Sequence, residues 1–181
     1  MQEETLDIIS HSSVQTQRLG MHLGELLTGG ELLLFDGQLG TGKTTFTQGL
    51  AQGLAITEVI SSPTFTLLKE YPGKLRPSSP DLRSPQTRSR LGPALFHFDL
   101  YRLDDPEEIL ELGFEDYFYG DGVCVVEWAG KADSLWATEH LRIRMTMMSE
   151  TERVLLFVAT GTRYCTLLRQ FQKNAYATAS S

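Results

Sequence analysis

The feature that most constrains this chain is an apolar run, residues 32–35, that leads through Asp36 into a glycine-rich turn ending in Gly-Lys-Thr-Thr. The spacing from Gly37 to Gly42, Lys43 and Thr44 is that of a phosphate-binding loop. Glycine permits positive φ angles and lets backbone N–H groups approach a phosphate closely. Those groups form an anion-binding hollow at the positive end of the following helix. The pattern therefore predicts a strand, a phosphate loop and a helix that begins near Lys43.

The side chains of this loop predict a magnesium–nucleoside triphosphate site. Lys43 supplies a positive charge for the β- and γ-phosphates, and Thr44 supplies a hydroxyl ligand for Mg²⁺. The alternative is a glycine-rich turn without a ligand. It is disfavoured because Phe46, Leu50 and Leu54 continue the motif at helical spacing, as a phosphate loop requires. The residues expected to contact the nucleotide are Gly40, Thr41, Gly42, Lys43, Thr44 and Thr45.

Two acidic residues end apolar runs later in the chain. Asp99 ends residues 95–99, and Glu127 ends residues 123–127. Acids at the carboxyl tips of strands next to a phosphate loop hold Mg²⁺ or position the attacking water. Asp99 capping a turn and Glu127 forming a salt bridge at the rim are the alternatives. We expect Lys43, Asp99 and Glu127 to be the catalytic residues, with Thr44, Asp99 and Glu127 as metal ligands. His97 is expected to be a satisfied structural residue.

The segment around Pro63 presents hydroxyl groups from a stiffened turn. Proline pushes the preceding residue into an extended conformation, so the hydroxyls of Ser62, Thr64 and Thr66 are well placed for a switch that senses γ-phosphate or Mg²⁺. The alternative is a strand entry with capping hydroxyls, and the spacing does not decide between them. A strand is expected to follow, with Phe65 and Tyr71 on one face. Lys131, downstream of Glu127, is a further candidate for contacting phosphate.

Composition limits the remaining function classes. The chain has 181 residues, which fits a single domain. Its formal charge of -7 argues against binding DNA by charge alone and makes direct contact with RNA secondary to contact with protein. No apolar run is long enough to cross a membrane, and the N-terminus is acidic, unlike a secretory signal. With two scattered cysteines, a cytoplasmic setting is expected.

The rest of the chain predicts regular structure interrupted by one insertion. Residues 72–93 contain five prolines, five basic residues and one acid, a local charge near +4, and are expected to be flexible. A solvated loop without a binding role is favoured there over a segment that contacts an anionic partner such as RNA. Residues 141–147 and 154–159 predict an antiparallel hairpin. Residues 163–172 predict an amphipathic helix, and residues 174–181 a disordered tail.

Four motifs together resemble one family, TsaE, the ATPase of bacterial tRNA threonylcarbamoyladenosine biosynthesis. They are the phosphate loop, Ser-Pro-Thr-Phe-Thr from Ser62, His-Phe-Asp-Leu-Tyr-Arg from His97, and Glu127-Trp128. The second and third motifs are not general features of phosphate-loop proteins. The resemblance runs from Thr16 to the hairpin. The chain departs from the family pattern at Thr41, usually alanine, and in the insertion.

The resemblance implies an α/β fold, with a P-loop NTPase-like mixed sheet flanked by helices before the C-terminal hairpin. It implies ATP and Mg²⁺ as cofactors, slow ATP hydrolysis, and docking on the TsaB–TsaD heterodimer. It also places Thr16 near adenine. Two other functions remain open: a small-molecule kinase, whose arginine-bearing lid the proline-broken insertion would serve poorly, and a nucleotide-binding scaffold without turnover.

Overall fold

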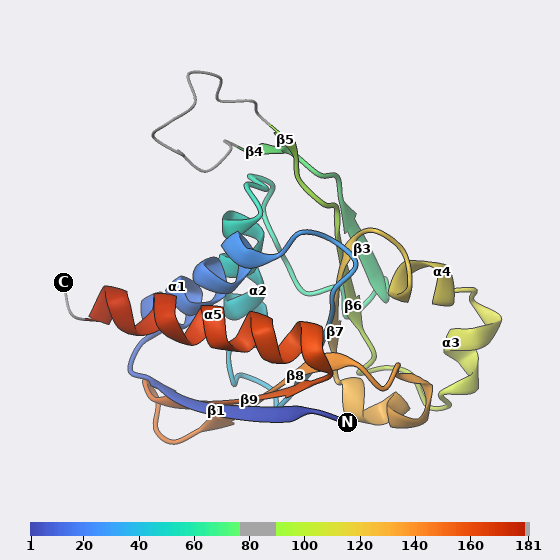
Figure 1. The fold of residues 1–181 in the computed structure, drawn as a ribbon. Helices are drawn as coiled ribbons and strands as arrows, with labels where there is room; N and C mark the ends of the chain where they lie inside the picture. The colour runs from blue at the N-terminus through green and yellow to red at the C-terminus, as the bar shows by residue number, and fades with distance from the viewer. Residues whose placement is uncertain (77–89, 180–181) are drawn as a thin grey trace.

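In the computed structural model, which describes residues 1–76 and 90–179, a seven-stranded sheet lies between two groups of helices (Figure 1). The strand order is β1-β9-β8-β2-β7-β6-β3. The strands are β1 (Glu3–Ser10), β2 (Leu32–Asp36), β3 (Leu68–Tyr71), β6 (Leu95–Asp99), β7 (Val123–Glu127), β8 (His140–Met147) and β9 (Arg153–Thr160). The helices are α1 (Ser13–Leu26), α2 (Lys43–Gly53), α3 (Glu107–Glu111), α4 (Glu115–Phe118), the 3-10 helix η1 (Ala129–Leu135) and α5 (Thr162–Ala179).

The sheet is mixed, which confirms the predicted fold class. Its centre is parallel, because β7 pairs in parallel with β2 and β6, and β2 pairs in parallel with β8. The flanks are antiparallel: β3 pairs with β6, and β8 and β9 form the predicted hairpin. Parallel strands bring their carboxyl ends to the same edge of a sheet. The phosphate loop after β2, Asp99 of β6 and Glu127 of β7 therefore meet at one edge.

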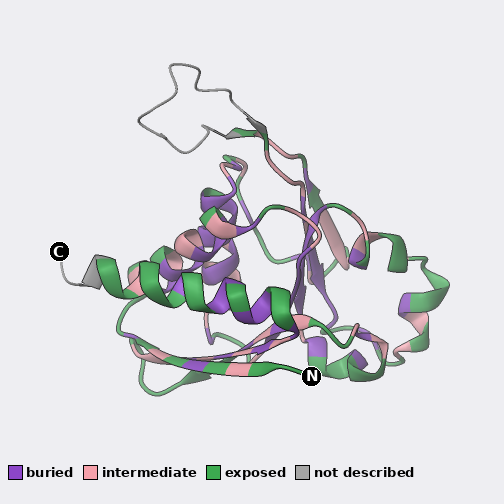
Figure 2. Cartoon of the chain, in the orientation of Figure 1, coloured by how far each residue is buried: buried purple, intermediate pink, exposed green. Residues whose placement is uncertain are grey.

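Alternate residues of the central strands enter two separate cores. Leu33 and Phe35 of β2 pack under α1, α2 and α5, whereas Leu32 and Leu34 pack with α3, α4 and η1. All five residues of β7 are buried, and Figure 2 shows the central strands buried on both sides. A strand that is covered on both faces has no side exposed to solvent, so its sequence is a continuous apolar run. The first of these cores also contains Phe46 and Leu50, which hold α2 over the sheet.

The helices α1 and α2 cross at very short distance. A Cβ atom added to Gly49 would lie 1.8 Å from the carbonyl oxygen of Gln17, which leaves no room for a side chain. Glycine is a poor helix former. Its presence inside α2 is explained by the close approach of α1, which fixes the direction in which α2 leaves the phosphate loop.

The predicted strand through Phe65 is wrong. The N–H groups of Thr66 and Leu67 both donate to the carbonyl oxygen of Pro63, which curls this segment into a turn. Phe65 is 83% exposed, and the guanidinium of Arg102 lies 4.2 Å from its ring centre. The strand therefore begins only at Leu68.

The predicted disordered tail is also wrong up to residue 179. Helix α5 continues to Ala179, and Ala175 packs against the core below α1 and α2. The apolar stripe that holds the first part of α5 thus extends beyond Gln172. Residues 180–181 lie outside the described residues.

Three further elements complete the fold. Strand β1 was not predicted and pairs with β9 along its whole length, from Glu3↔Thr160 to Ser10↔Arg153. Within residues 72–93, β4 (Leu75–Arg76) pairs with β5 (Arg90–Leu91) in a two-stranded hairpin. Flexibility was predicted for the whole of residues 72–93; residues 77–89 lie outside the described residues, so for them it stays a prediction. No helix among the described residues is long and apolar enough to span a membrane.

Candidate phosphate-binding site

The carboxyl edge of the parallel strands encloses a hollow of about 360 Å³. Its walls come from the phosphate loop, the start of α2, the turn around Pro63 and the ends of β6 and β7. The residues lining it are Leu39, Gly40, Gly42, Lys43, Thr44, Thr45, Ser62, Thr64, Asp99, Tyr101, Glu127 and Trp128. The structure therefore brings together the predicted residues that the sequence places far apart.

The phosphate loop positions an ammonium group at the floor of this hollow. Gly42 takes a positive φ of 100° immediately before α2, a backbone conformation that residues other than glycine rarely adopt. The Nζ atom of Lys43 donates to the carbonyl oxygens of Gly37 at 2.6 Å and Gln38 at 2.9 Å, and lies 4.6 Å from the Trp128 ring centre. Burial lowers the pKa of Lys43, while the nearby carboxylates of Glu127 and Asp99 oppose that shift. A partly dehydrated cation of this kind is well suited to bind phosphate oxygen.

Asp99 is held by the turn around Pro63. Its Oδ2 atom accepts hydrogen bonds from the hydroxyls of Ser62 at 3.0 Å and Thr64 at 2.9 Å. Its Oδ1 atom accepts from the backbone N–H of Tyr101 at 2.9 Å. The hydroxyls of Ser62 and Thr64 therefore contact the acid at the tip of β6.

Glu127 lies beside the first turn of α2. Its Oε1 atom accepts from the Thr44 hydroxyl at 3.2 Å and from Nε2 of His97 at 2.9 Å. The predicted metal ligands Thr44, Asp99 and Glu127 thus line one hollow, and all three are oxygen donors.

This donor set fits magnesium better than a structural metal. Within residues 1–76 and 90–179, no three His, Cys, Asp or Glu side chains gather into a metal-binding group. Magnesium is usually bound through one or two carboxylates together with the phosphates of its substrate. Asp99, Glu127 and the Thr44 hydroxyl are sufficient for such a shared site, and a resident metal without a nucleotide is not expected.

A second, adjoining hollow of about 270 Å³ shares Gly40, Gly42 and Thr45 with the first. Thr16 of α1 lines it, and its hydroxyl lies 2.7 Å from that of Ser10. The sequence had not pointed to the other wall, which is the β8–β9 turn with Glu150, Thr151 and Arg153. Nη2 of Arg153 donates to the Gly40 carbonyl at 3.2 Å. This contact ties the hairpin to the phosphate loop, and only the fold brings the two segments together.

Two predicted nucleotide contacts lie outside both hollows. The hydroxyl of Thr41 donates to the carbonyl oxygen of Gln38 at 2.9 Å and is thereby used within the loop. Nζ of Lys131 donates to the carbonyl oxygens of Tyr101 and Leu103. The structure does not bring the Lys131 side chain to the phosphate loop; it anchors the segment after Asp99 instead.

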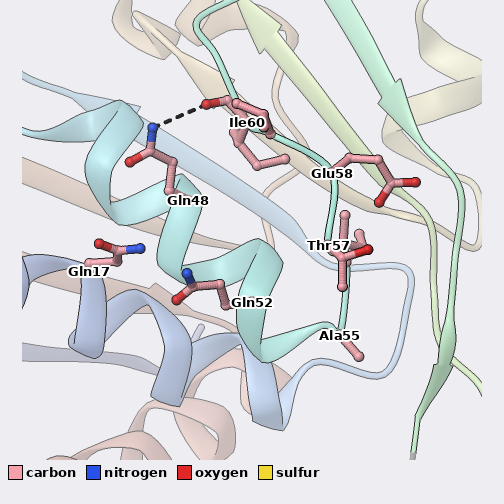
Figure 3. Close-up of a pocket in the computed structure, with 9 residues that line it drawn as sticks. Gln17, Gln48, Gln52, Ala55, Thr57, Glu58 and Ile60 are labelled. Carbon is pink, nitrogen blue, oxygen red and sulfur yellow. Dashed lines mark hydrogen bonds between the residues drawn. The ribbon is translucent and has the colours of Figure 1, made fainter.

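A larger hollow of about 470 Å³ lies farther along α2 (Figure 3). Amide groups of Gln17, Gln48 and Gln52 face it, and Nε2 of Gln48 donates to the Ile60 carbonyl at 3.1 Å. Glu58 is the charged residue in its wall, and it is paired with Lys74 at 2.7 Å. Among the described residues, no lysine or arginine lines this hollow, so its volume does not make it the nucleotide site.

Comparisons with known proteins show which family the chain resembles. A model of the family described as threonylcarbamoyl adenosine biosynthesis protein TsaE matches residues 10–155. TsaE proteins of Bacillus subtilis and of a Nostoc species are 39% identical over 145 residues and 45% identical over 142 residues. The matched parts cover 80% of both chains in the first case and 76% of both in the second.

A solved structure shows the same architecture. The crystal structure of YdiB from Bacillus subtilis superposes with a TM-score of 0.74 at 29% sequence identity, covering 96% of this chain and 98% of that one. The family resemblance drawn from the four motifs is confirmed. The chain belongs to the TsaE family of tRNA threonylcarbamoyladenosine biosynthesis proteins.

Proposed function

We propose that the chain binds Mg–ATP in the hollow between the phosphate loop and the two acids, and hydrolyses it slowly in support of tRNA N6-threonylcarbamoyladenosine formation. One observation carries this proposal: Lys43, Thr44, Asp99 and Glu127, from three separate parts of the chain, line the same hollow. Such a combination of cation, hydroxyl and carboxylates is what polyphosphate and Mg²⁺ require.

The residues have distinct roles in this proposal. The loop amides and Lys43 bind the phosphates, and the ammonium group exchanges its carbonyl partners for phosphate oxygens. Thr44, Asp99 and Glu127 hold Mg²⁺, which when bound neutralises charge on the β- and γ-phosphates. Glu127 also orients the attacking water. Thr16 and the β8–β9 turn border the space that remains for the nucleoside.

The same geometry supports the proposed low intrinsic rate. Among the described residues, no arginine lines the hollow that holds Lys43. The nearby Arg102 has its guanidinium over the ring of Phe65. An arginine that reaches the transferred phosphate contributes about 10³ to 10⁵ in rate. We therefore propose that turnover depends on docking to the TsaB–TsaD heterodimer in the cytoplasm, with tRNA contacted only indirectly.

The experiment is a comparison of wild type and Lys43→Ala, measured as Mg–ATP affinity and as ATP hydrolysis with and without the TsaB–TsaD pair. The variant should bind at least about tenfold more weakly, because a hydrogen bond to a charged group contributes about 1.5–3 kcal/mol. Lys69→Ala is a matched control, since that ammonium contacts Ser61 outside the hollow. Equal affinity and equal hydrolysis in wild type and Lys43→Ala would contradict the proposal.

A further inference from the structure

We propose that His97 is a positioning residue that fixes the Glu127 carboxylate for magnesium-dependent nucleotide binding. This inference rests on the proposed function, but it is carried by a separate set of contacts. The imidazole lies beneath the hollow rather than in its wall, and it is fully buried.

The imidazole and the carboxylate form a buried polar pair under α2. His97 is on β6 and Glu127 is on the neighbouring strand β7, and both are at most 2% exposed. Their neighbours on the same strands, Leu95 and Val125, belong to the apolar core. Burying polar groups among apolar side chains costs free energy unless they are paired. The bond between Nε2 and Oε1 at 2.9 Å is that pairing.

The other imidazole nitrogen indicates that His97 does more than fill space in the core. Among the described residues, Nδ1 of His97 is buried and has no hydrogen-bond partner. An unsatisfied buried polar atom costs about 1–3 kcal/mol, a cost that an apolar side chain of similar size would avoid. An ionised carboxylate only accepts hydrogen bonds, so Nε2 carries the hydrogen in this contact. The advantage of histidine over leucine at this position is therefore the hydrogen bond from its Nε2 to Glu127.

The two donors to Glu127 differ in what a ligand would do to them. The Thr44 hydroxyl lines the hollow and is itself a proposed metal ligand, so nucleotide and metal compete for it. His97 does not face the hollow, so its bond to Oε1 can persist when the hollow fills. Hydrogen-bond partners behind a metal ligand typically contribute about 10–100-fold to metal affinity. His97 thus keeps the carboxylate aligned after Thr44 has turned to the metal.

Side-chain chemistry provides matched variants for the test. Glutamine carries its amide nitrogen as many bonds from the backbone as Nε2 of histidine, so His97→Gln retains the donor to Glu127. Asparagine places its amide nitrogen at the level of Nδ1, so His97→Asn keeps polarity but loses this donor. His97→Leu removes both nitrogens. Thermal unfolding of each variant would verify that it folds.

The measurement is the affinity for a fluorescent ATP analogue, titrated with Mg²⁺ and repeated in EDTA. His97→Asn and His97→Leu should raise the Mg²⁺ concentration for half-maximal effect by roughly 10–100-fold. His97→Gln should restore it to within about threefold of wild type, and affinity in EDTA should be unchanged in all variants, because the phosphate loop is intact.

Two results would overturn the inference. One is wild-type Mg²⁺ dependence in both His97→Asn and His97→Leu. The other is equal weakening in EDTA and in Mg²⁺ for glutamine and asparagine alike, which indicates a purely structural residue. If wild type itself bound no nucleotide, the proposed function would fail along with the inference. A normal wild-type response with no difference among the variants would overturn the inference alone.

Discussion

Two of the hollows that border α2, the phosphate-loop hollow that holds Lys43 and the amide-lined hollow farther along the helix, differ in chemistry more than in size. The first, at the start of the helix, gathers one lysine and two carboxylates from the loop, β6 and β7. The second, along the later turns, is larger and is faced by amides of Gln17, Gln48 and Gln52 (Figure 3). The contrast teaches that charge arrangement, and not volume, marks the site in this fold.

Their positions on the sheet explain the difference. The first hollow lies beyond the carboxyl ends of three parallel strands, where each strand ends in a polar residue or a loop. The second lies between α1, α2 and the segment that follows α2, away from those ends. Ligands bind at the carboxyl edge of parallel sheets because side chains from separate strands converge there.

The largest effect is expected when the negative charges are removed from the phosphate-loop hollow. Replacing Asp99 with Asn and Glu127 with Gln in one chain removes both negative metal ligands while preserving shape. Mg²⁺ should then strengthen nucleotide binding about 10²- to 10⁴-fold less than in wild type, since each charged contact contributes about 1.5–3 kcal/mol. Isothermal titration calorimetry with and without Mg²⁺ measures this. An unchanged Mg²⁺ response would contradict the assignment of both acids.

A second prediction concerns the close packing of α1 against α2, away from the phosphate-loop hollow. Gly49→Ala forces a Cβ atom against the Gln17 carbonyl, so α1 and α2 must move apart near the larger hollow. We expect a loss of about 1–3 kcal/mol in the free energy of unfolding, typical of overpacking, measured by urea denaturation. This outweighs the gain of up to about 1 kcal/mol that alanine brings to an exposed helix. A stabilised variant would show that the helices do not cross as described.

A smaller effect is expected at the turn that holds Asp99. Ser62→Ala combined with Thr64→Val removes both hydroxyl donors to Oδ2. The Mg²⁺ concentration for half-maximal nucleotide binding should rise about tenfold, which corresponds to about 1.4 kcal/mol and lies within the range for hydrogen bonds. Ser61→Ala is the matched control, because its hydroxyl contacts Lys69 instead. Equal behaviour of control and test variants would remove the turn from the metal site.

The smallest effect is expected in the amide-lined hollow. Gln48→Ala combined with Gln52→Ala removes two of its three amides but no charge. Nucleotide affinity should change less than about twofold, since the larger charged contributions lie elsewhere. A competition assay with a fluorescent nucleotide is sensitive enough to show this. A tenfold loss of nucleotide affinity would instead indicate that the nucleotide binds in the amide-lined hollow.

Local patterns were sufficient to predict the centre of the molecule. The glycine spacing before Lys43 and the apolar runs ending in Asp99 and Glu127 each occupy a short segment, and each was found where expected. The close approach of Gln17 to Gly49 exists only once α1 and α2 are packed, so no local pattern predicts it.

Other features depend on contacts between distant segments. Phe65 follows a strand-like pattern, yet the Pro63 carbonyl draws the next N–H groups into a turn. Strand β1 is stabilised by pairing with β9, more than a hundred residues away. His97 was expected to be satisfied, whereas the structure pairs one of its nitrogens with Glu127 and leaves the other without a partner among the described residues. Periodicity in a single segment cannot predict such pairings.

The most direct test is a crystal structure of wild-type protein with Mg²⁺ and a non-hydrolysable ATP analogue. Our account predicts phosphates along the amides of residues 40–45, Nζ of Lys43 on phosphate oxygen, and the metal beside Thr44, Asp99 and Glu127. Nucleotide bound in the amide-lined hollow, or a metal that contacts neither acid, would contradict it.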